Sequence, residues 1–304
     1  MKVLRTPDER FRDLPDYPFE PHYAEVDGLR MHYVDEGSRD GATVLLLHGE
    51  PSWSYLYRFM IPPLAEAGFR VIAPDLIGFG KSDKLSRRSD YSYAGHVAWM
   101  TGFVEHLALT GINLFCQDWG SLIGLRVAAE NPDRFARIAL ANGGLPTGDE
   151  PMPKAFQNWQ RFARFSPWFP IGKIIQKASR RTLSDAEVAA YDAPFPGDRY
   201  KAATRAFPLL VPTTPDNPAS DANRAAWQTF ERWEKPFLTL FSDKDPVTRG
   251  GERLWQSRVP GAEGEAHATM HGGGHFLQED CGPELAAAMI RFCGGASGET
   301  HAVS

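Results

Sequence analysis

Three polar residues of this sequence stand where an apolar run of strand length ends: Asp118, Asp245 and His275. Their types match the parts of a nucleophilic hydrolysis, in which a carboxylate attacks carbon, a histidine activates water and a second carboxylate supports the histidine. An aspartate is already ionised at neutral pH, so it can act as a nucleophile without a base to remove its proton. These residues are the candidate catalytic triad.

Asp118 lies between a short apolar run and a segment with helical periodicity. The neighbouring Cys116, Gly120 and Ser121 are small, which suits a tight turn from strand to helix. Such a turn projects its central side chain above a sheet, beside the first N–H groups of the helix. The alternative is that Asp118 only caps the helix that follows it.

His275 follows the glycine run 272–274, and Asp245 follows the apolar run 237–241. A lone loop histidine is more often satisfied by backbone groups, but here the three residues occur in the order nucleophile, acid, histidine. In a parallel sheet the carboxyl ends of all strands face one side, so residues far apart in the sequence can converge there. Asp243 is the alternative acid, although its position favours a turn residue.

The elements that must position these residues alternate along the chain. Strands are predicted at 43–47, 69–73, 113–117, 137–142 and 237–241, with a last short strand around 266–270, and helical segments at 56–64, 93–109 and 283–292. A hairpin of strands 22–26 and 30–34 is predicted around Asp27-Gly28 at the edge of the sheet. This alternation predicts a mostly parallel α/β sheet.

The alternation stops near Leu145-Pro146. From Thr147 to about Trp227 the chain is mostly helical in pattern and rich in proline and aromatic residues, with no buried strand. We interpret this segment as an inserted helical cap. The predicted division is a first core part at 1–146, a cap at 147–228, and a second core part with a flexible tail at 229–304.

Composition limits the classes of partner. The 304 residues are 42% hydrophobic and carry a net charge of −5 without a basic stripe, so we expect no nucleic-acid partner. No run is long enough to span a membrane, and we expect no membrane association. Three cysteines without paired spacing make a disulfide framework improbable and favour a reducing, cytoplasmic location. We expect a monomer or weak homodimer.

Several motifs together resemble one known family. They are His48-Gly49-Glu50-Pro51, Cys116-Gln117-Asp118-Trp119-Gly120, Ser242-Asp243-Lys244-Asp245-Pro246, Gly274-His275-Phe276-Leu277-Gln278-Glu279 and the cap run 190–196. The combination resembles the haloalkane dehalogenases of the α/β-hydrolase superfamily over roughly residues 20 to 293. The resemblance implies an α/β-hydrolase core, with a mostly parallel eight-stranded sheet flanked by helices, and an inserted helical cap.

That resemblance implies hydrolysis of small haloalkanes to alcohol, halide ion and a proton, with no metal and no organic cofactor. Asp118 would displace the halide and form an alkyl ester, because displacement at carbon needs an anionic nucleophile held in line. His275, supported by Asp245, would activate the water that hydrolyses the ester. The backbone N–H groups of Glu50 and Trp119 would stabilise the oxyanion.

The leaving halide needs hydrogen-bond donors. The indole N–H of Trp119 can donate and cannot accept, and it lies next to the nucleophile. In the resembled family the second donor is commonly a cap tryptophan or an asparagine after His-Gly. That place holds Glu50, which as a carboxylate would repel halide, so a cap tryptophan is implied. Trp159, on an aromatic stripe at helical spacing, is the candidate, and Trp168 is the alternative.

Other functions stay open at this stage. Epoxide hydrolases share the Asp-Trp pair and need acids over the site, typically two cap tyrosines, for which Tyr191 and Tyr200 are available. Glu50 favours the dehalogenases, since epoxide hydrolases usually carry an aromatic or apolar residue there. A non-catalytic binding protein or an oxygenase on the same scaffold is a further alternative. Some members of the resembled family place the acid one strand earlier, near Asn142 here, which cannot ionise.

Overall fold

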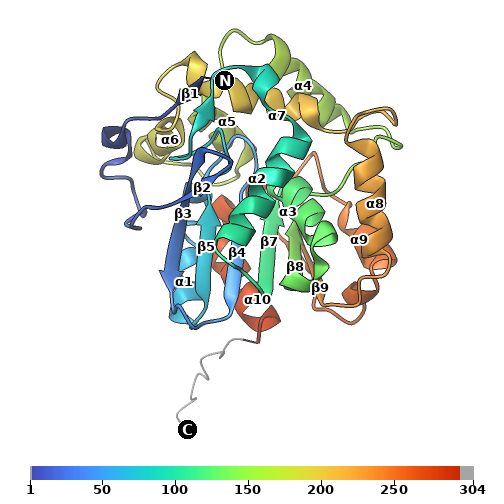
Figure 1. Ribbon diagram of the computed structural model, residues 1–304. Helices are drawn as coiled ribbons and strands as arrows, with labels where there is room; N and C mark the ends of the chain where they lie inside the picture. The colour runs from blue at the N-terminus through green and yellow to red at the C-terminus, as the bar shows by residue number, and fades with distance from the viewer. Residues whose placement is uncertain (1, 295–304) are drawn as a thin grey trace.

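An eight-stranded sheet runs through the molecule, and the computed structural model describes residues 2–294 (Figure 1). In spatial order its strands are β10 (Ala268–Met270), β9 (Phe237–Ser242), β8 (Phe135–Ala141), β7 (Ile112–Gln117), β4 (Thr43–Leu47), β5 (Arg70–Pro74), β3 (Leu29–Gly37) and β2 (His22–Val26). Pairing is parallel from β10 to β5, whereas β3 and β2 are antiparallel. The predicted mostly parallel sheet with an edge hairpin is therefore confirmed.

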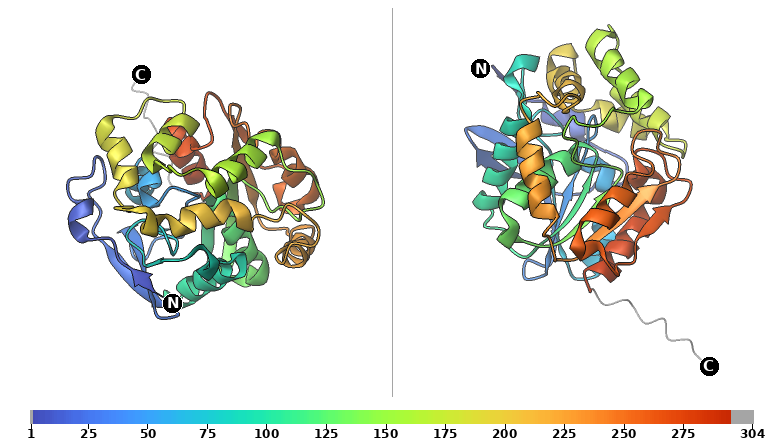
Figure 2. Two further views of the ribbon diagram at one scale, coloured as in Figure 1. Left: turned by 90° about the horizontal axis from the view of Figure 1, so that it is seen from above. Right: turned by 90° about the vertical axis from the view of Figure 1, so that its right-hand side faces the viewer.

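The central strands are apolar because both faces of the sheet are covered. Every residue of β7 and β9 is buried. Helices α1 (Ile61–Glu66) and α10 (Leu277–Phe292) pack together on one face, and α2 (Tyr93–His106) and α3 (Trp119–Glu130) on the other (Figures 1 and 2). The sheet is thereby a rigid frame, and the carboxyl ends of its parallel strands, from β10 to β5, all point to the same side.

Helices from the middle of the chain cover that side. They are α4 (Lys154–Phe165), α5 (Ile171–Ala178), α6 (Asp185–Asp192) and α7 (Ala202–Leu210). The chain then returns through α8 (Ser220–Phe230), which packs against α3 on the flank of the sheet, and α9 (Glu252–Arg258) follows β9. Between β8 and β9 the described chain contains no strand, as the sequence predicts.

Two helices differ from the sequence prediction. The helix expected at 56–64 is a 3-10 turn at Ser54–Tyr57 followed by the short α1. The last helix begins at Leu277, ahead of the expected Pro283, and bends at Cys281. Proline lacks an N–H and its ring crowds the preceding turn, which accounts for the bend. The predicted flexible tail, from residue 295 on, lies outside the described residues.

A small second sheet pairs β1 (Val3–Leu4) with β6 (Lys84–Leu85) in antiparallel fashion.

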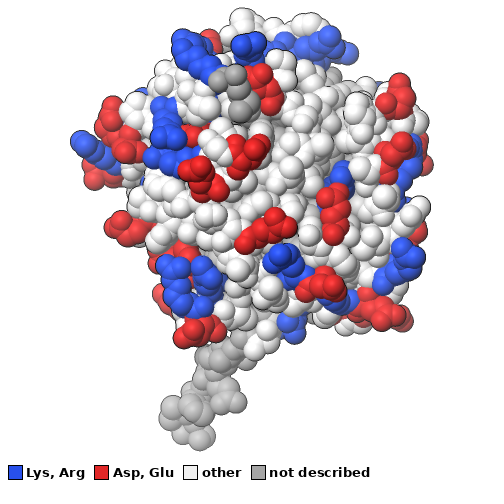
Figure 3. Space-filling model, in the orientation of Figure 1, with Lys and Arg blue, Asp and Glu red and all other residues white. Residues whose placement is uncertain are grey.

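Acidic and basic side chains are interspersed over the face seen in Figure 3. In residues 2–294 we find no helix long and apolar enough to cross a bilayer, and no cluster of His, Cys, Asp and Glu arranged to hold a metal ion.

Candidate active site

Asp118 occupies a strained turn between β7 and α3, with φ 49° and ψ −125°. The turn is possible only because its neighbours are small. A Cβ added at Gly120 would lie 1.9 Å from the carbonyl oxygen of Leu47, and one at Gly49 would lie 2.4 Å from the Cβ of Asp118. No side chain fits at either place, so both glycines are needed for the close approach of these segments.

The Asp118 carboxylate is held from two directions. The backbone N–H of Glu50 donates to Oδ1 at 2.7 Å, and Nε2 of His275 lies 3.4 Å from Oδ2. The side chain of Asp118 keeps 23% of its surface exposed, enough to meet a small molecule. Trp119 is the first residue of α3, so its N–H has no partner within the helix.

The other ring nitrogen of His275, Nδ1, is hydrogen-bonded to Oδ2 of Asp245 at 3.0 Å. Asp245 is fully buried and also accepts hydrogen bonds from the N–H of Val247, at 2.9 Å, and from the N–H and hydroxyl of Thr248. Asp243 instead accepts the N–H of Gly272 at 2.8 Å. The structure therefore brings Asp245, and not Asp243, to the histidine.

The two carboxylates set the charge of the histidine. Burial lowers the pKa of His275, but the charge of Asp245 and the hydrogen bonds to Asp118 and Asp245 more than offset this, so the pKa lies well above its usual value. Burial raises the pKa of Asp245, and the charge of His275 with its hydrogen bonds lowers it further than burial raises it. Without substrate the favoured state is an imidazolium between two carboxylates.

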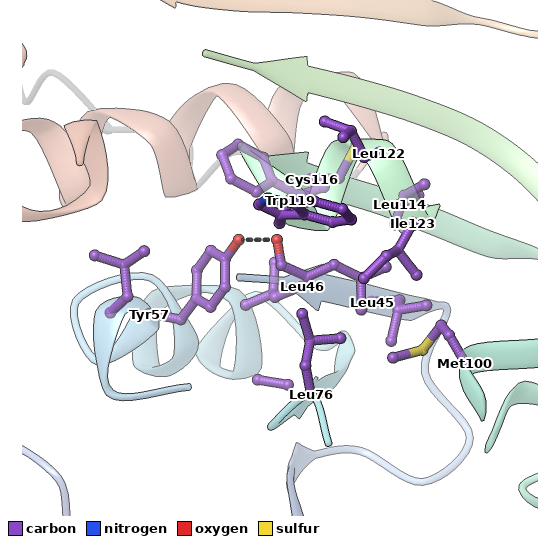
Figure 4. Close-up of a cluster of buried hydrophobic side chains, with 14 of the residues drawn as sticks. Leu45, Leu46, Tyr57, Leu76, Met100, Leu114, Cys116, Trp119, Leu122 and Ile123 are labelled. Carbon is purple, nitrogen blue, oxygen red and sulfur yellow. Dashed lines mark hydrogen bonds between the residues drawn. The ribbon is translucent and has the colours of Figure 1, made fainter. Parts of the chain in front are cut away.

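Trp119 is packed too tightly to change orientation. Its ring lies 4.4 Å from that of Phe207 and 5.2 Å from that of Tyr93, centroid to centroid. The hydroxyl of Tyr93 is itself fixed, since it donates to the carbonyl of Leu122 at 2.6 Å. Figure 4 shows the indole resting on a cluster of buried aliphatic side chains from β4, β7 and α3. Its position is therefore set by the core.

The cap tryptophans are in different surroundings. Trp159 is partly buried and packs on Phe169, whereas Trp168 is 63% exposed and faces Lys173. The side chain of Trp159 also lies near the buried carboxyl of Glu50, since it offsets part of the rise in the pKa of that group that burial and the charge of Asp118 cause. Trp159 thus lies above the loop that holds the nucleophile, and Trp168 lies on the outside of the cap.

The sequence analysis treats Glu50 as a carboxylate that would repel a halide, and the surroundings of Glu50 in the structure oppose that charge. Burial, and then the charge of Asp118, raise its pKa well above the usual value, and its Oε1 has no hydrogen-bond partner. The neutral acid is therefore favoured, and charge alone does not exclude Glu50 from the neighbourhood of a halide. The sequence could not show this, because burial decides the protonation state.

A cavity of about 660 Å³ leads to the nucleophile. Its walls at the site include Asp118, Trp119 and Leu122, with Phe156 of α4 beside them. Further out it is lined by the loop after β8 and by residues of α8 and α9. Most of its surface is apolar, so it suits a small hydrophobic substrate.

Sequence reasoning missed residues that hold the triad in place. Thr248 supports Asp245, Gln117 donates from its side chain to the carbonyl of His275 at 3.1 Å, and Asn142 binds the same carbonyl. The only signal was that Asn142 stands where some relatives place the acid. Phe207, which fixes Trp119, lies far away in the cap sequence and gave no signal.

Comparisons with known proteins agree with this geometry. The sequence model of the alpha/beta hydrolase fold matches residues 42–280. A haloalkane dehalogenase from Psychrobacter cryohalolentis is 58% identical over 297 residues, covering 96% of this chain and 98% of that protein. One from Mycolicibacterium paratuberculosis is 55% identical over 295 residues, covering 95% and 98%. The structure of the haloalkane dehalogenase DpaA from Paraglaciecola agarilytica, described as tetrameric, superposes with a TM-score of 0.89 at 36% identity, covering 94% and 97%.

The fold and the site at the strand ends define an α/β-hydrolase with an aspartate where serine is more usual. Within that class the chain belongs to the haloalkane dehalogenase family. It is a hydrolase that takes a small molecule and water as substrates, and the epoxide hydrolase alternative is not favoured.

Proposed function

We propose that this enzyme cleaves carbon–halogen bonds of small haloalkanes through an alkyl ester on Asp118. The observation that carries the proposal is the chain of contacts from Asp118 through His275 to Asp245, at 3.4 and 3.0 Å. It joins an ionised nucleophile to a base that can act only after the nucleophile has reacted. No metal or organic cofactor enters the proposal.

In the first step a carboxylate oxygen of Asp118 attacks the carbon that bears the halogen. A carbon–oxygen bond forms as the carbon–halogen bond breaks, and the bonding electrons leave with the halide. The halide gains charge as it departs, so donors fixed in advance stabilise the transition state. Trp119 and Trp159 would supply two indole N–H groups for it, one from the core and one from the cap.

In the second step water attacks the ester carbonyl carbon of Asp118. The charges of Asp245 and Asp118 and the hydrogen bonds to both raise the pKa of His275, and ester formation removes the charge of Asp118. That pKa therefore falls once the ester forms, so the imidazolium releases its proton to solvent and the neutral imidazole takes a proton from the attacking water. The N–H groups of Glu50 and Trp119 would stabilise the tetrahedral oxyanion. Its collapse breaks the bond to the alkoxide oxygen, which takes the proton from His275 to give the alcohol, and the carboxyl group of Asp118 then ionises.

Trapping the ester tests this sequence of steps. His275→Phe should still displace halide but should not hydrolyse the ester. After exposure to 1,2-dibromoethane, intact-mass measurement should show one covalent bromoethyl group on the protein. The doubly substituted Asp118→Ala/His275→Phe protein is the control and should show none. A folded His275→Phe protein without any adduct would contradict the mechanism.

Epoxide opening lacks part of its machinery in this structure. Tyr191 is fully buried, and its hydroxyl donates to the carboxylate of Glu279. It is therefore engaged away from Asp118 and is not free to protonate an alkoxide there.

We also propose the division into core 1–146, cap 147–228 and core 229–304, and a cytoplasmic location. The location is supported by the three cysteines, none of which forms a disulfide.

We further propose a monomer or weak homodimer, because few large apolar side chains of the described residues are exposed. They are Val3, Tyr23, Phe165, Trp168, Leu209 and Leu254. Light scattering tests this, and a tetramer like that described for DpaA would overturn it.

A further inference from the structure

Asn142 stands at the carboxyl end of β8 and is fully buried. Its φ of 30° is rare for residues other than glycine, although asparagine tolerates positive values better than most. In this conformation its main-chain carbonyl accepts the N–H of Asp118 at 3.1 Å. The backbone of Asn142 is thus part of the turn that presents the nucleophile.

The side chain of Asn142 points to the other two triad strands. Its Nδ2 lies 2.9 Å from the carbonyl of Gly274, 3.1 Å from the carbonyl of His275 and 2.8 Å from Oγ of Ser242. Its Oδ1 accepts the N–H of Ser242 at 2.8 Å. An amide group has two N–H donors, so its three oxygen neighbours share them, while its oxygen accepts one hydrogen bond.

These contacts meet a requirement of the histidine loop. The sheet ladder ends at Met270, and after His271 come three glycines, 272–274, with wide conformational freedom. The carbonyls of Gly274 and His275 would lack the donors that strands supply. Asn142 supplies one group to both, with help at Gly274 from the hydroxyl of Ser242 and at His275 from Gln117. The loop is then fixed directly before the imidazole.

We propose that Asn142 is a positioning residue for His275, acting through its side-chain amide on ester hydrolysis and not on halide displacement. The effect should fall on ester hydrolysis alone because of the atoms that the Asn142 amide contacts. The amide contacts the loop of His275 and the end of β9, whereas Asp118 is contacted only by the main-chain carbonyl, which a substitution at 142 retains where the backbone keeps its positive φ. This inference rests on the two-step reaction proposed above.

Single-turnover kinetics of Asn142→Ala with 1,2-dibromoethane tests the inference. Release of the first bromide should stay within about threefold of wild type. Hydrolysis of the ester should slow by about tenfold to a hundredfold, as expected for the loss of one or two buried hydrogen bonds. Rapid quenching followed by intact-mass measurement should therefore show the ester accumulating on Asn142→Ala.

A pH profile separates positioning from a merely structural role. His275 owes its raised pKa partly to the close contact with Asp245, so a loosened loop should lower the apparent pKa of the hydrolysis step. The matched control is Asn113→Ala. Asn113 is also buried in the sheet and donates to the carbonyl of Thr43, close to where β7 begins and away from the triad. It should leave the step ratio and the pH profile unchanged.

Equal slowing of both steps, or an unchanged pH profile, would overturn the inference, as would the same effect in Asn113→Ala. If Asn142→Ala fails to fold, Asn142→Ser is the test variant. The serine hydroxyl can still donate to one carbonyl, so ester hydrolysis should slow by a smaller factor and halide displacement should again be unaffected. An ester that forms on His275→Phe but not on either Asn142 variant contradicts only this inference. The absence of ester on His275→Phe contradicts the reaction itself.

Discussion

Charged groups on the two sides of the cap lie in opposite surroundings. On the side of the histidine loop, Arg58 and Glu279 of the core are fully buried and meet Glu187 of α6. On the side of the cavity, Arg224 of α8 is 34% exposed and pairs with Asp149 of the cap loop at 2.6 Å. The same kind of ion pair therefore contributes very differently to stability on the two sides.

The buried group is a dense network, in which Nε of Arg58 is left without a hydrogen-bond partner. Glu279 accepts both Nη atoms of Arg58, at 2.5 and 2.9 Å, together with Arg181 and the hydroxyl of Tyr191. Arg58 also bonds Glu187 at 2.9 Å. Two residues of the core and three of the cap thus share their charges and hydrogen bonds where water cannot replace a missing partner.

The exposed pairs border the cavity. Arg224 with Asp149, and Arg258 with Glu231, all line it, and water can replace each partner. Such pairs contribute roughly 0–1 kcal/mol, whereas removing one member of a buried pair costs about 3–5 kcal/mol. The cavity therefore opens on the weakly held side of the cap, and the cap is held firmly beside His275.

The largest expected effect is on stability. Arg58→Met should lower the free energy of unfolding by about 3–5 kcal/mol, because Glu279 and Glu187 lose their shared buried cation. Methionine can still pack on the rings of Tyr55 and Phe59 that the guanidinium now covers. Urea unfolding followed by circular dichroism measures the change. Arg224→Met is the control and should cost less than about 1 kcal/mol.

Similar losses in these two variants would remove the distinction between the two sides. A stable Arg58→Met protein with normal activity would show that Arg181 alone satisfies both carboxylates.

The next effect is on catalysis and compares the inside of the cap with its outside. Trp159→Phe keeps the aromatic packing on Phe169 and removes only the N–H donor. Because a hydrogen bond to a charged group contributes roughly 1.5–3 kcal/mol, halide displacement should slow by about tenfold to a hundredfold. Stopped-flow bromide release measures this step. Trp168→Phe is the matched control on the exposed side and should stay near wild type.

If Trp168→Phe is the damaging change, the cap donor is wrongly assigned but the dehalogenase mechanism stands. Bromide bound between Trp119 and Trp159 should quench tryptophan fluorescence. If neither substitution matters and bromide does not quench, the two tryptophans do not bind the halide.

Acid should weaken the buried side first. Burial raises the pKa of Glu187, but hydrogen bonds from Arg181, Ser184 and Arg58 lower it to about 2. A carboxyl whose pKa is depressed on folding stabilises the protein above its ordinary pKa of 4.5, and this contribution is lost as pH falls toward 2. The unfolding free energy should therefore fall from pH 5 to pH 3, and Arg181→Gln should show a shallower fall. A parallel fall in both proteins would contradict this origin of the acid sensitivity.

Much of the frame was predictable, and the reason is local. Apolar runs such as Thr43–Leu47 identify buried strands, and the parallel rule then brings Asp118, Asp245 and His275 to one edge. The supporting residues were not predictable, because their roles depend on long-range partners. Arg58 reads as a surface charge until the fold buries it, and Asn142 reads as a non-ionising substitute for an acid until its contacts are seen.

The smallest expected effect concerns the exposed pair between Arg224 and Asp149. Asp149→Asn keeps the shape and leaves Arg224 its contact with Asp221 at 2.7 Å, so stability should hardly change. If the weakly held side opens to admit substrate, kcat/KM for 1,2-dibromoethane should rise about twofold at low salt. The rise should vanish near 1 M salt, where the Debye length is about 3 Å and the pair is already screened in wild type. Glu130→Gln, which removes the Arg126–Glu130 pair on α3 away from the cavity, is the control and should show no such salt dependence. A rise that persists at high salt, or an equal rise in Glu130→Gln, would mean that the pair does not restrain this side of the cap.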